Sequence, residues 1–285
     1  MTQVLKKQER RVLKHLFIAL SMGFAFQGGL SLTASAVDDA GTGVQTESEM
    51  TTLHALWTAL TTEYVSTPED GINRFDYARL QANVGDRAAL DEYIDALAAL
   101  PLSTLPEDER FAAYANLYNA LTVRLIVEKY PVESITNIRP NILSIGPWKQ
   151  AIITVEGEVL SLDNIEHDIL RVQFDDPRVH YAVNCASIGC PNLRQSAWVA
   201  ETLDEDLNDA ARDYINHPRG VTIRRDGRLK VSNIYKWFRE DFGDSEAGVV
   251  EHLLQHAEPE LADAIRARPD IADHGYDWSL NDIPK

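Results

Sequence analysis

The side chains best suited to chemistry lie in one short stretch of the chain, between residues 166 and 190. That stretch holds a glutamate, two histidines, an asparagine, a serine and two cysteines: Glu166, His167, His180, Asn184, Cys185, Ser187 and Cys190. A free thiol ionises with a pKa of about 8.5, so it needs an imidazole or a helix N-terminus to become a thiolate near neutral pH. Because nucleophiles and bases occur together here, the stretch predicts a cysteine nucleophile paired with a histidine base.

Cys185 is the nucleophile that we expect, with His167 as its base. Residues 179–184 (VHYAVN) alternate and are rich in β-forming side chains, which predicts a strand that delivers Cys185 at its end. His180 lies five residues before Cys185 on that strand and would point to the opposite side. His167 belongs to a separate helix predicted to begin at residues 161–163, so it is free to approach the thiol.

The other residues of the stretch are expected to support this pair. Cys190 is the reserve nucleophile and His180 the reserve base. Glu166 is a candidate for orienting the imidazole, and a distant aspartate is an equal one. The Asn184 side chain, or backbone N–H groups of residues 187–189, would hold the oxyanion of an acyl-transfer intermediate.

Two other interpretations of the cysteines stay open. Four residues including a glycine separate Cys185 from Cys190, so the pair can close a disulfide in an oxidising compartment. So short a loop gains only ~2 kcal/mol or less in the chain-entropy model. A zinc site made of His167, His180 and both cysteines has suitable ligand types, but the spacing matches no tight zinc signature. We therefore predict neither a metal nor a cofactor.

Six further residues are candidates for substrate contact: Asn116, Tyr118, Asn119, Trp148, Arg171 and Arg178. The two asparagines lie inside the apolar helical segment ANLYNALTVRLI, where asparagine is unfavourable, so each predicts a buried polar role; a satisfied core amide is the alternative. The two arginines could bind an anionic substrate, or they could be salt-bridge partners on an acidic surface.

The first 36 residues have the three parts of a cleavable secretory signal. A basic head is followed by an apolar run of eleven residues, 16–26, and by a small-residue end at Ala34-Ser35-Ala36. A membrane span needs ~20 residues, so the run is too short to serve as an anchor. We expect cleavage near Ala36, a periplasmic or secreted location and no membrane span in the mature chain.

The charge of the chain restricts its partners. The sequence carries 44 Asp and Glu against 27 Lys and Arg, a net charge of −17, and signal removal would make it more acidic. A polyanion repels nucleic acid and anionic lipid surfaces, so neither is an expected partner. A small molecule, a peptide or a cell-wall fragment fits better as substrate.

Hydrophobic periodicity predicts an α+β fold that is rich in helices. Residues 37–49 are small and acidic and predict a flexible leader, after which residues 50–285 form a single catalytic or binding domain. Helical patterns cover residues 50–65, 86–100, 106–130 and 202–216. Two antiparallel hairpins are expected in the middle of the chain, with turns at Glu156-Gly157 and Asp226-Gly227.

With these residues in view, the chain resembles the domain-of-unknown-function 547 family. The resemblance rests on ANLYNALTVRLIVEKYP (115–131), LSLDNIEHDILR (160–171), DPRVHYAVNCASIGCPNLR (176–194), IYKWFREDF (234–242) and YDWSLN (276–281). It places the family's motif residues at Asn116, Tyr118, Asn119, Glu166, His167, His180, Cys185, Cys190, Pro191, Asp277 and Trp278. The resemblance implies a shared pocket and an exported bacterial protein, but no established activity.

Two functions from different classes follow. The segments are also similar, by arrangement only, to papain and transglutaminase-like hydrolases in a rearranged order, with histidine ahead of cysteine. The first hypothesis is accordingly a thiol-dependent hydrolase or acyl transferase acting on an amide or ester. The second is a binding or scaffold module whose loop is shaped by a Cys185–Cys190 disulfide.

Overall fold

The computed structural model describes residues 40–141 and 144–284. The predicted signal and the first residues of the predicted leader lie outside the described residues. Helix α2 (Ala40–Tyr64) begins inside the segment predicted as leader, ten residues before its expected start. The described residues from Thr42 onwards form one compact unit.

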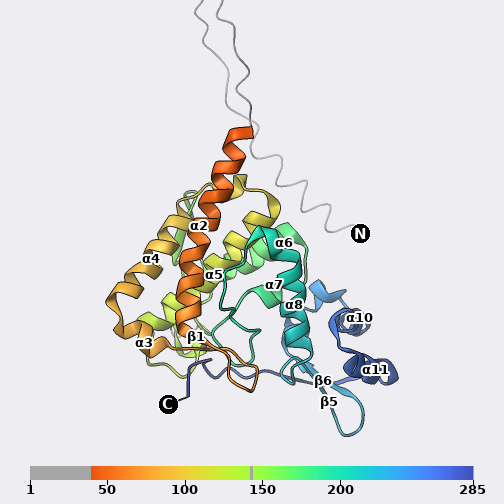
Figure 1. Cartoon of the computed structure of the whole chain (residues 1–285). Helices are drawn as coiled ribbons and strands as arrows, with labels where there is room; N and C mark the ends of the chain where they lie inside the picture. Colours follow the sequence, from red (N-terminus) through yellow and green to blue (C-terminus); the bar gives the residue numbers. More distant parts are fainter. Residues whose placement is uncertain (1–39, 142–143, 285) are drawn as a thin grey trace, which may run out of the picture. The chain divides into compact units, whose positions relative to one another are not determined.

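The protein is an α+β fold in which helices dominate and the sheets are small (Figure 1). The elements that follow α2 are, in chain order, β1 (Val65–Ser66), β2 (Arg74–Phe75), α3 (Tyr77–Ala82), α4 (Val84–Ala98), η1 (Leu102–Thr104), α5 (Glu107–Lys129), η2 (Ile135–Asn137), β3 (Ile153–Val155), β4 (Glu158–Leu160), η3 (Asn164–Leu170), α6 (Arg171–Phe174), α7 (Val179–Ala182), η4 (Ala200–Thr202), α8 (Leu203–Ile215), β5 (Val221–Ile223), β6 (Leu229–Ser232), α9 (Ile234–Trp237), η5 (Arg239–Phe242), α10 (Glu246–His256), α11 (Pro259–Ala267) and β7 (Ile271–Gly275).

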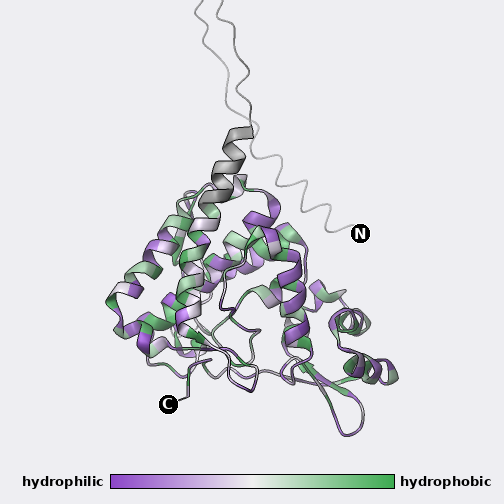
Figure 2. Cartoon of the chain, in the orientation of Figure 1, coloured by the Kyte–Doolittle hydropathy of each residue, from purple (hydrophilic) through white to green (hydrophobic). Residues whose placement is uncertain are grey.

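Helix α5 is the centre of the larger hydrophobic core. Pro106 precedes it and three acidic residues fill its first turn, which suits the positive end of the helix dipole. From Phe111 to Val127 every residue except Arg124 is buried, and a helix that is apolar on nearly all sides must be enclosed by others. It packs against α3, α4 and η3. In contrast, α8 is amphipathic, and much of it is purple in Figure 2.

Both predicted hairpins are present. Strands β3 and β4 pair antiparallel through a turn in which Glu156 and Gly157 have positive φ, as a tight two-residue hairpin requires. Strands β5 and β6 form the second hairpin, and β7 adds to β6 in parallel. The parallel strand β7 comes from the far end of the chain. It brings residues 276–278 next to the segment between the two cysteines, residues 185–190, which we call the cysteine loop.

The prediction of a strand over residues 179–184 is wrong. Val179–Ala182 form the helical turn α7, and only at Val183 does the backbone become extended. The reason lies just upstream, at Asp176-Pro177. Proline favours the first turn of a helix, and the Asp176 side chain accepts the Arg178 backbone N–H. This local start signal overrides the β-forming preference of the apolar residues that follow.

No helix among the described residues combines the length and the hydropathy needed to cross a lipid bilayer.

Candidate functional site

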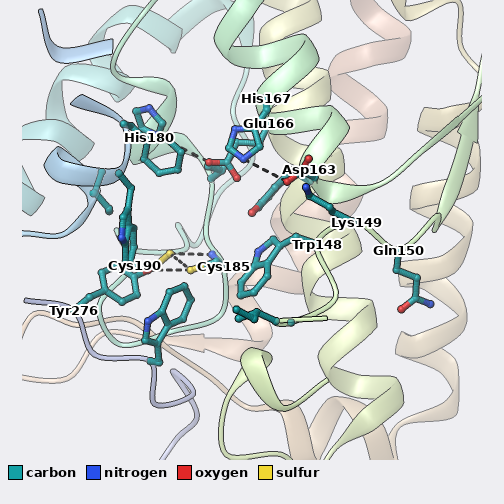
Figure 3. A pocket seen from close by; sticks show the side chains of 18 of the residues that line it. Trp148, Lys149, Gln150, Asp163, Glu166, His167, His180, Cys185, Cys190 and Tyr276 are labelled. Atoms are coloured by element: carbon teal, nitrogen blue, oxygen red, sulfur yellow. Dashed lines mark hydrogen bonds and ion pairs between the residues drawn. The ribbon is translucent and has the colours of Figure 1, made fainter. Parts of the chain in front are cut away.

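A pocket of about 740 Å³ collects most of the sequence-predicted residues (Figure 3). Its lining comes from α5, the loop before β3, η3, α7, the cysteine loop, α9 and the segment after β7. The predicted residues in that lining are Tyr118, Trp148, Glu166, His167, His180, Cys185 and Cys190. The other predicted residues, which are absent from the lining, are Asn116, Asn119, Arg171, Arg178 and Asn184.

The two cysteines form a close pair of free thiols in the wall of this pocket. Their sulfur atoms lie 2.6 Å apart, and the backbone N–H of Cys185 donates to Sγ of Cys190 at 2.9 Å. The hydroxyl oxygens of Tyr276 and Ser187 lie 3.0 Å and 3.2 Å from Sγ of Cys185. Cys190 is buried, whereas Cys185 is partly exposed to the pocket.

The environment lowers the pKa of one thiol and raises that of the other. Burial raises the pKa of Cys185 well above its ordinary value, and the hydrogen bond and negative charge of Cys190 add to this. Burial acts in the same direction on Cys190, but hydrogen bonds from the Cys185 thiol, the Tyr276 hydroxyl and the Cys185 N–H outweigh it and lower the Cys190 pKa. The pair therefore loses its first proton with the negative charge resting on Cys190.

Buried amides hold the cysteine loop in shape. The Asn184 side chain donates to the Pro191 carbonyl at 2.7 Å and accepts the Ala186 N–H at 2.8 Å. Asn119 accepts the N–H of Asn184, again at 2.8 Å. Ala186 has a φ of +58°, a strained value for a residue with a Cβ. Asn184 thus supports the loop, in place of the oxyanion contact expected from the sequence.

Opposite the thiols, His180 belongs to a chain of acid–base groups. Its Nε2 lies 2.6 Å from Oδ2 of Asp241 and its Nδ1 lies 4.0 Å from Oε1 of Glu166, while Phe238 stacks on the ring. Burial would raise the pKa of Asp241, but its bonds to His180 and Arg171 hold that pKa at about 2. Asp241 is therefore an anion at neutral pH.

The Tyr118 hydroxyl interacts with Glu166 and with both sulfurs. Burial raises the pKa of this hydroxyl well above its ordinary value. The negative charges of Glu166, Cys185 and Cys190 and the hydrogen bond to Glu166 raise that pKa further. The hydroxyl therefore remains protonated, and it is a neutral donor between the carboxylate and the thiols.

The predicted pair between Cys185 and His167 is not formed. His167 accepts a hydrogen bond from Arg171 at 3.1 Å through Nδ1, and its Nε2 lies 3.6 Å from Oδ1 of Asp163. Figure 3 shows this contact with Asp163 on the wall away from the sulfurs. Within the part of the chain that the structure describes, no imidazole nitrogen hydrogen-bonds to either sulfur. The Tyr276 and Ser187 hydroxyls contact Sγ of Cys185, and the Cys185 N–H contacts Sγ of Cys190.

The remaining candidates hold the structure together. Asn116 donates to the Trp198 carbonyl and accepts the Trp198 N–H, which fits the core-amide alternative. Arg171 binds Glu240 and Asp241, and Arg178 binds Asp176 and Asp204, as the salt-bridge alternative expected.

The predictions of site residues left out Tyr276, Asp241 and much of the aromatic wall. Three indoles, those of Trp148, Trp237 and Trp278, line the pocket with Tyr276, and their ring centroids lie 4.6–5.6 Å from their neighbours. Trp148 and Tyr276 lie on opposite sides of the thiol pair in Figure 3. The YDWSLN segment was the available signal for Tyr276. The IYKWFREDF segment (234–242) was the corresponding signal for Asp241, which lies more than fifty residues after Cys190.

This arrangement can be compared with known families. Residues 102–215, from η1 to the end of α8, match the family described as "Protein of unknown function, DUF547". The match is to this segment of the chain. The DUF547 segment contains both cysteines, Glu166 and both pocket histidines, whereas Tyr276 and Asp241 lie beyond it. No significant match was found among curated proteins or among solved structures.

No group of three or more His, Cys, Asp or Glu residues, within residues 40–141 and 144–284, is arranged to hold a metal ion.

Proposed function

We propose that this protein is a thiol-dependent hydrolase or acyl transferase that acts on an amide or ester bond, with Cys185 as nucleophile. The observation that carries the proposal is the thiol pair itself. Sγ of Cys190 lies 2.6 Å from Sγ of Cys185, and it is stabilised as an anion by the Cys185 N–H and the Tyr276 hydroxyl. Cys190 thus takes the place that the sequence suggested for an imidazole.

The chemical step is balanced within the pocket. Cys185 passes its proton to the Cys190 thiolate while its sulfur forms a bond to the substrate carbonyl carbon. The Tyr276 and Ser187 hydroxyls, beside that sulfur, donate to the developing oxyanion. The C–N or C–O bond then breaks, and the leaving group takes the proton that Cys190 received. Water or a second acceptor next attacks the thioester carbonyl and gives its proton to the Cys190 thiolate. The C–S bond breaks, the acyl group leaves on the acceptor, and the proton returns from Cys190 to Cys185.

The lining indicates what kind of substrate fits. Trp148, Trp237 and Trp278 give the pocket a broad apolar surface, and Trp237 is 44% exposed. Aromatic walls favour apolar or ring-shaped groups, with polar contacts confined to a few positions. We propose a small molecule, peptide or cell-wall fragment of this kind as substrate, met after export of the chain.

Turnover of p-nitrophenyl acetate, acyl-aminocoumarin amides and peptidoglycan fragments tests the proposal. The wild type is expected to hydrolyse at least one of them, and Cys185→Ala is expected to lose that activity. Arg178→Met is a suitable control, because its ion pairs lie outside the pocket. Equal turnover by the wild type and Cys185→Ala would refute the assignment.

A second candidate is a non-catalytic binding or scaffold module with a Cys185–Cys190 disulfide. The sulfur separation of 2.6 Å favours it, since the pair can be oxidised without moving the backbone far. Mass spectrometry of protein purified without reductant distinguishes the two candidates. A quantitative disulfide in the resting protein supports the scaffold, and two alkylatable thiols support the enzyme.

A further inference from the structure

Arg219 is a cation that has no carboxylate partner. It lies in the turn between α8 and β5, half-buried, with its Nε enclosed and without an acceptor. No Asp or Glu among the described residues lies within ion-pair distance of its guanidinium. Arg171, Arg178 and Arg194 all bind carboxylates. Asp213 interacts with Arg219 only through longer-range charge. An enclosed cation that lacks a direct ion pair is costly to bury.

The guanidinium instead donates hydrogen bonds to the cysteine loop and to the residue that follows Pro191. One Nη donates to the Cys190 carbonyl at 2.7 Å and to the Ile188 carbonyl at 3.3 Å, and the other donates to Oδ1 of Asn192 at 2.7 Å. Tyr214, whose ring lies under the guanidinium, donates to the Gly189 carbonyl at 2.7 Å. The end of α8 therefore fixes the backbone on both sides of Cys190.

The sulfur of Cys190 is an anion that can balance this charge, beside the carboxylate of Asp213, whereas the nearby cation Arg74 opposes it. Burial lowers the pKa of Arg219, while nearby negative charge on Tyr214 or Cys190 would raise it. Burial also raises the pKa of Tyr214 and of Tyr276 well above the ordinary value, so both phenols stay neutral near pH 7. Among these neighbours only the Cys190 thiol has a lowered pKa.

We propose that Arg219 is a positioning residue that stabilises the singly ionised Cys185–Cys190 pair, both by its positive charge and by holding residues 188–192 in place. The inference rests on the proposed function in that the pair is the nucleophilic centre. It adds the group that keeps the pair charged. A guanidinium suits this task because its flat fork binds two acceptors at once while it stays protonated.

The test is the pH profile of iodoacetamide alkylation of the fully reduced, full-length protein. In Arg219→Met the first thiol ionisation is expected to move up by at least one pH unit, and alkylation at pH 7 to slow at least tenfold. Arg219→Gln, which keeps a donor for the loop, should show a similar shift. Arg219→Lys, which keeps the charge, should shift less. Arg212→Met removes an exposed arginine near the end of α8 and should match the wild type.

Two results would overturn the inference. One is a folded Arg219→Met or Arg219→Gln variant whose profile superimposes on that of the wild type. The other is an Arg219→Lys shift as large as that of the neutral variants, which would leave no role for the charge. If Arg219→Met does not fold, the pH profile of alkylation of Arg219→Gln decides the question. Alkylation needs no turnover, so a missing acyl activity would refute the proposed function without affecting this result.

Discussion

The backbone nitrogen of Cys185 lies 2.9 Å from Sγ of Cys190, so one cysteine stabilises the thiolate of the other across a loop of four intervening residues. The sulfur atoms of the same two residues lie 2.6 Å apart. A proton on Cys185 and a charge on Cys190 are thereby coupled, and the pair titrates as one unit. This coupling takes the place of the histidine expected from the sequence.

Replacing Cys190 by Ser should slow thiol alkylation near neutral pH. The lowered pKa belongs to Cys190, so the variant lacks the thiol that ionises first, and the Cys185 thiol that remains keeps the burial that raises its pKa. We expect iodoacetamide to react with Cys190→Ser at least tenfold more slowly than with the wild type at pH 7, which equals about one pH unit. The two rates should converge at pH values where all thiols are ionised. Equal rates at pH 7 would show that Cys190 is not the thiol that ionises first.

Asp241 should stabilise the fold, and it should do so less in acid. Its folded pKa of about 2 is below the ordinary value of 3.8, so its contribution is full above pH 4 and is lost as pH falls through 2. The shift corresponds to about 2 kcal/mol. Urea unfolding of the wild type and Asp241→Asn at pH 7 and at pH 3 measures it. The stability difference should shrink at pH 3. A difference that is independent of pH would argue against the ion pair with His180 and Arg171.

His54 should remain neutral far below its ordinary pKa of 6.5. Burial lowers its pKa to about 4, only partly opposed by the charge of Glu201, and Nδ1 lies 3.1 Å from the Tyr93 hydroxyl. In the unfolded chain His54 binds a proton near pH 6.5, whereas in the folded chain it binds one only near pH 4. The free energy of unfolding therefore decreases by about 3 kcal/mol as the pH falls from 6.5 to 4. An NMR titration of the His54 ring checks this. A midpoint near 6.5 would contradict the buried, uncharged state.

Gly189→Ala should disrupt the cysteine loop. A Cβ there would lie 2.8 Å from the backbone nitrogen of Asp277 and 2.9 Å from its carbonyl oxygen, so the segment that carries Tyr276 would have to move. We expect a loss of stability of about 1–3 kcal/mol and slower alkylation of the thiols. Gly85→Ala is the matched control. Gly85 lies in α4, where an added Cβ would make only an ordinary contact, 3.5 Å from Oδ1 of Asn83, so this substitution should stabilise the fold by about 0.5–1 kcal/mol. An unperturbed Gly189→Ala would contradict the close contact.

Much of the fold was predictable because its signals are local. Pro106, an acidic first turn and a long apolar pattern predict the helix over 106–130, and α5 occupies nearly that range. The turn at Glu156-Gly157 needs positive φ, which glycine permits, and it appears where expected. The residues of the pocket were largely found for a related reason, since nucleophiles and bases are rare enough in sequence to attract notice.

The pairing of those residues was not predictable from spacing. His167 was matched to Cys185 on the assumption of a strand at 179–184, and the Asp176-Pro177 helix start removes that strand. Tyr276 reaches the thiols only because β7 pairs in parallel with β6 from the far end of the chain. Such long-range contacts depend on tertiary packing, and no local pattern encodes them.

The central claim is that Cys185 forms a covalent acyl bond with Cys190 as its proton acceptor. The most direct measurement is intact-protein mass spectrometry of the reduced full chain after brief exposure to p-nitrophenyl acetate near pH 7, with peptide mapping. We expect a single acetyl adduct on Cys185 of the wild type. The adduct should be absent in Cys185→Ala and should form at least tenfold more slowly in Cys190→Ser. An unmodified Cys185, or acetylation confined to lysine side chains such as Lys149 at the pocket, would contradict it.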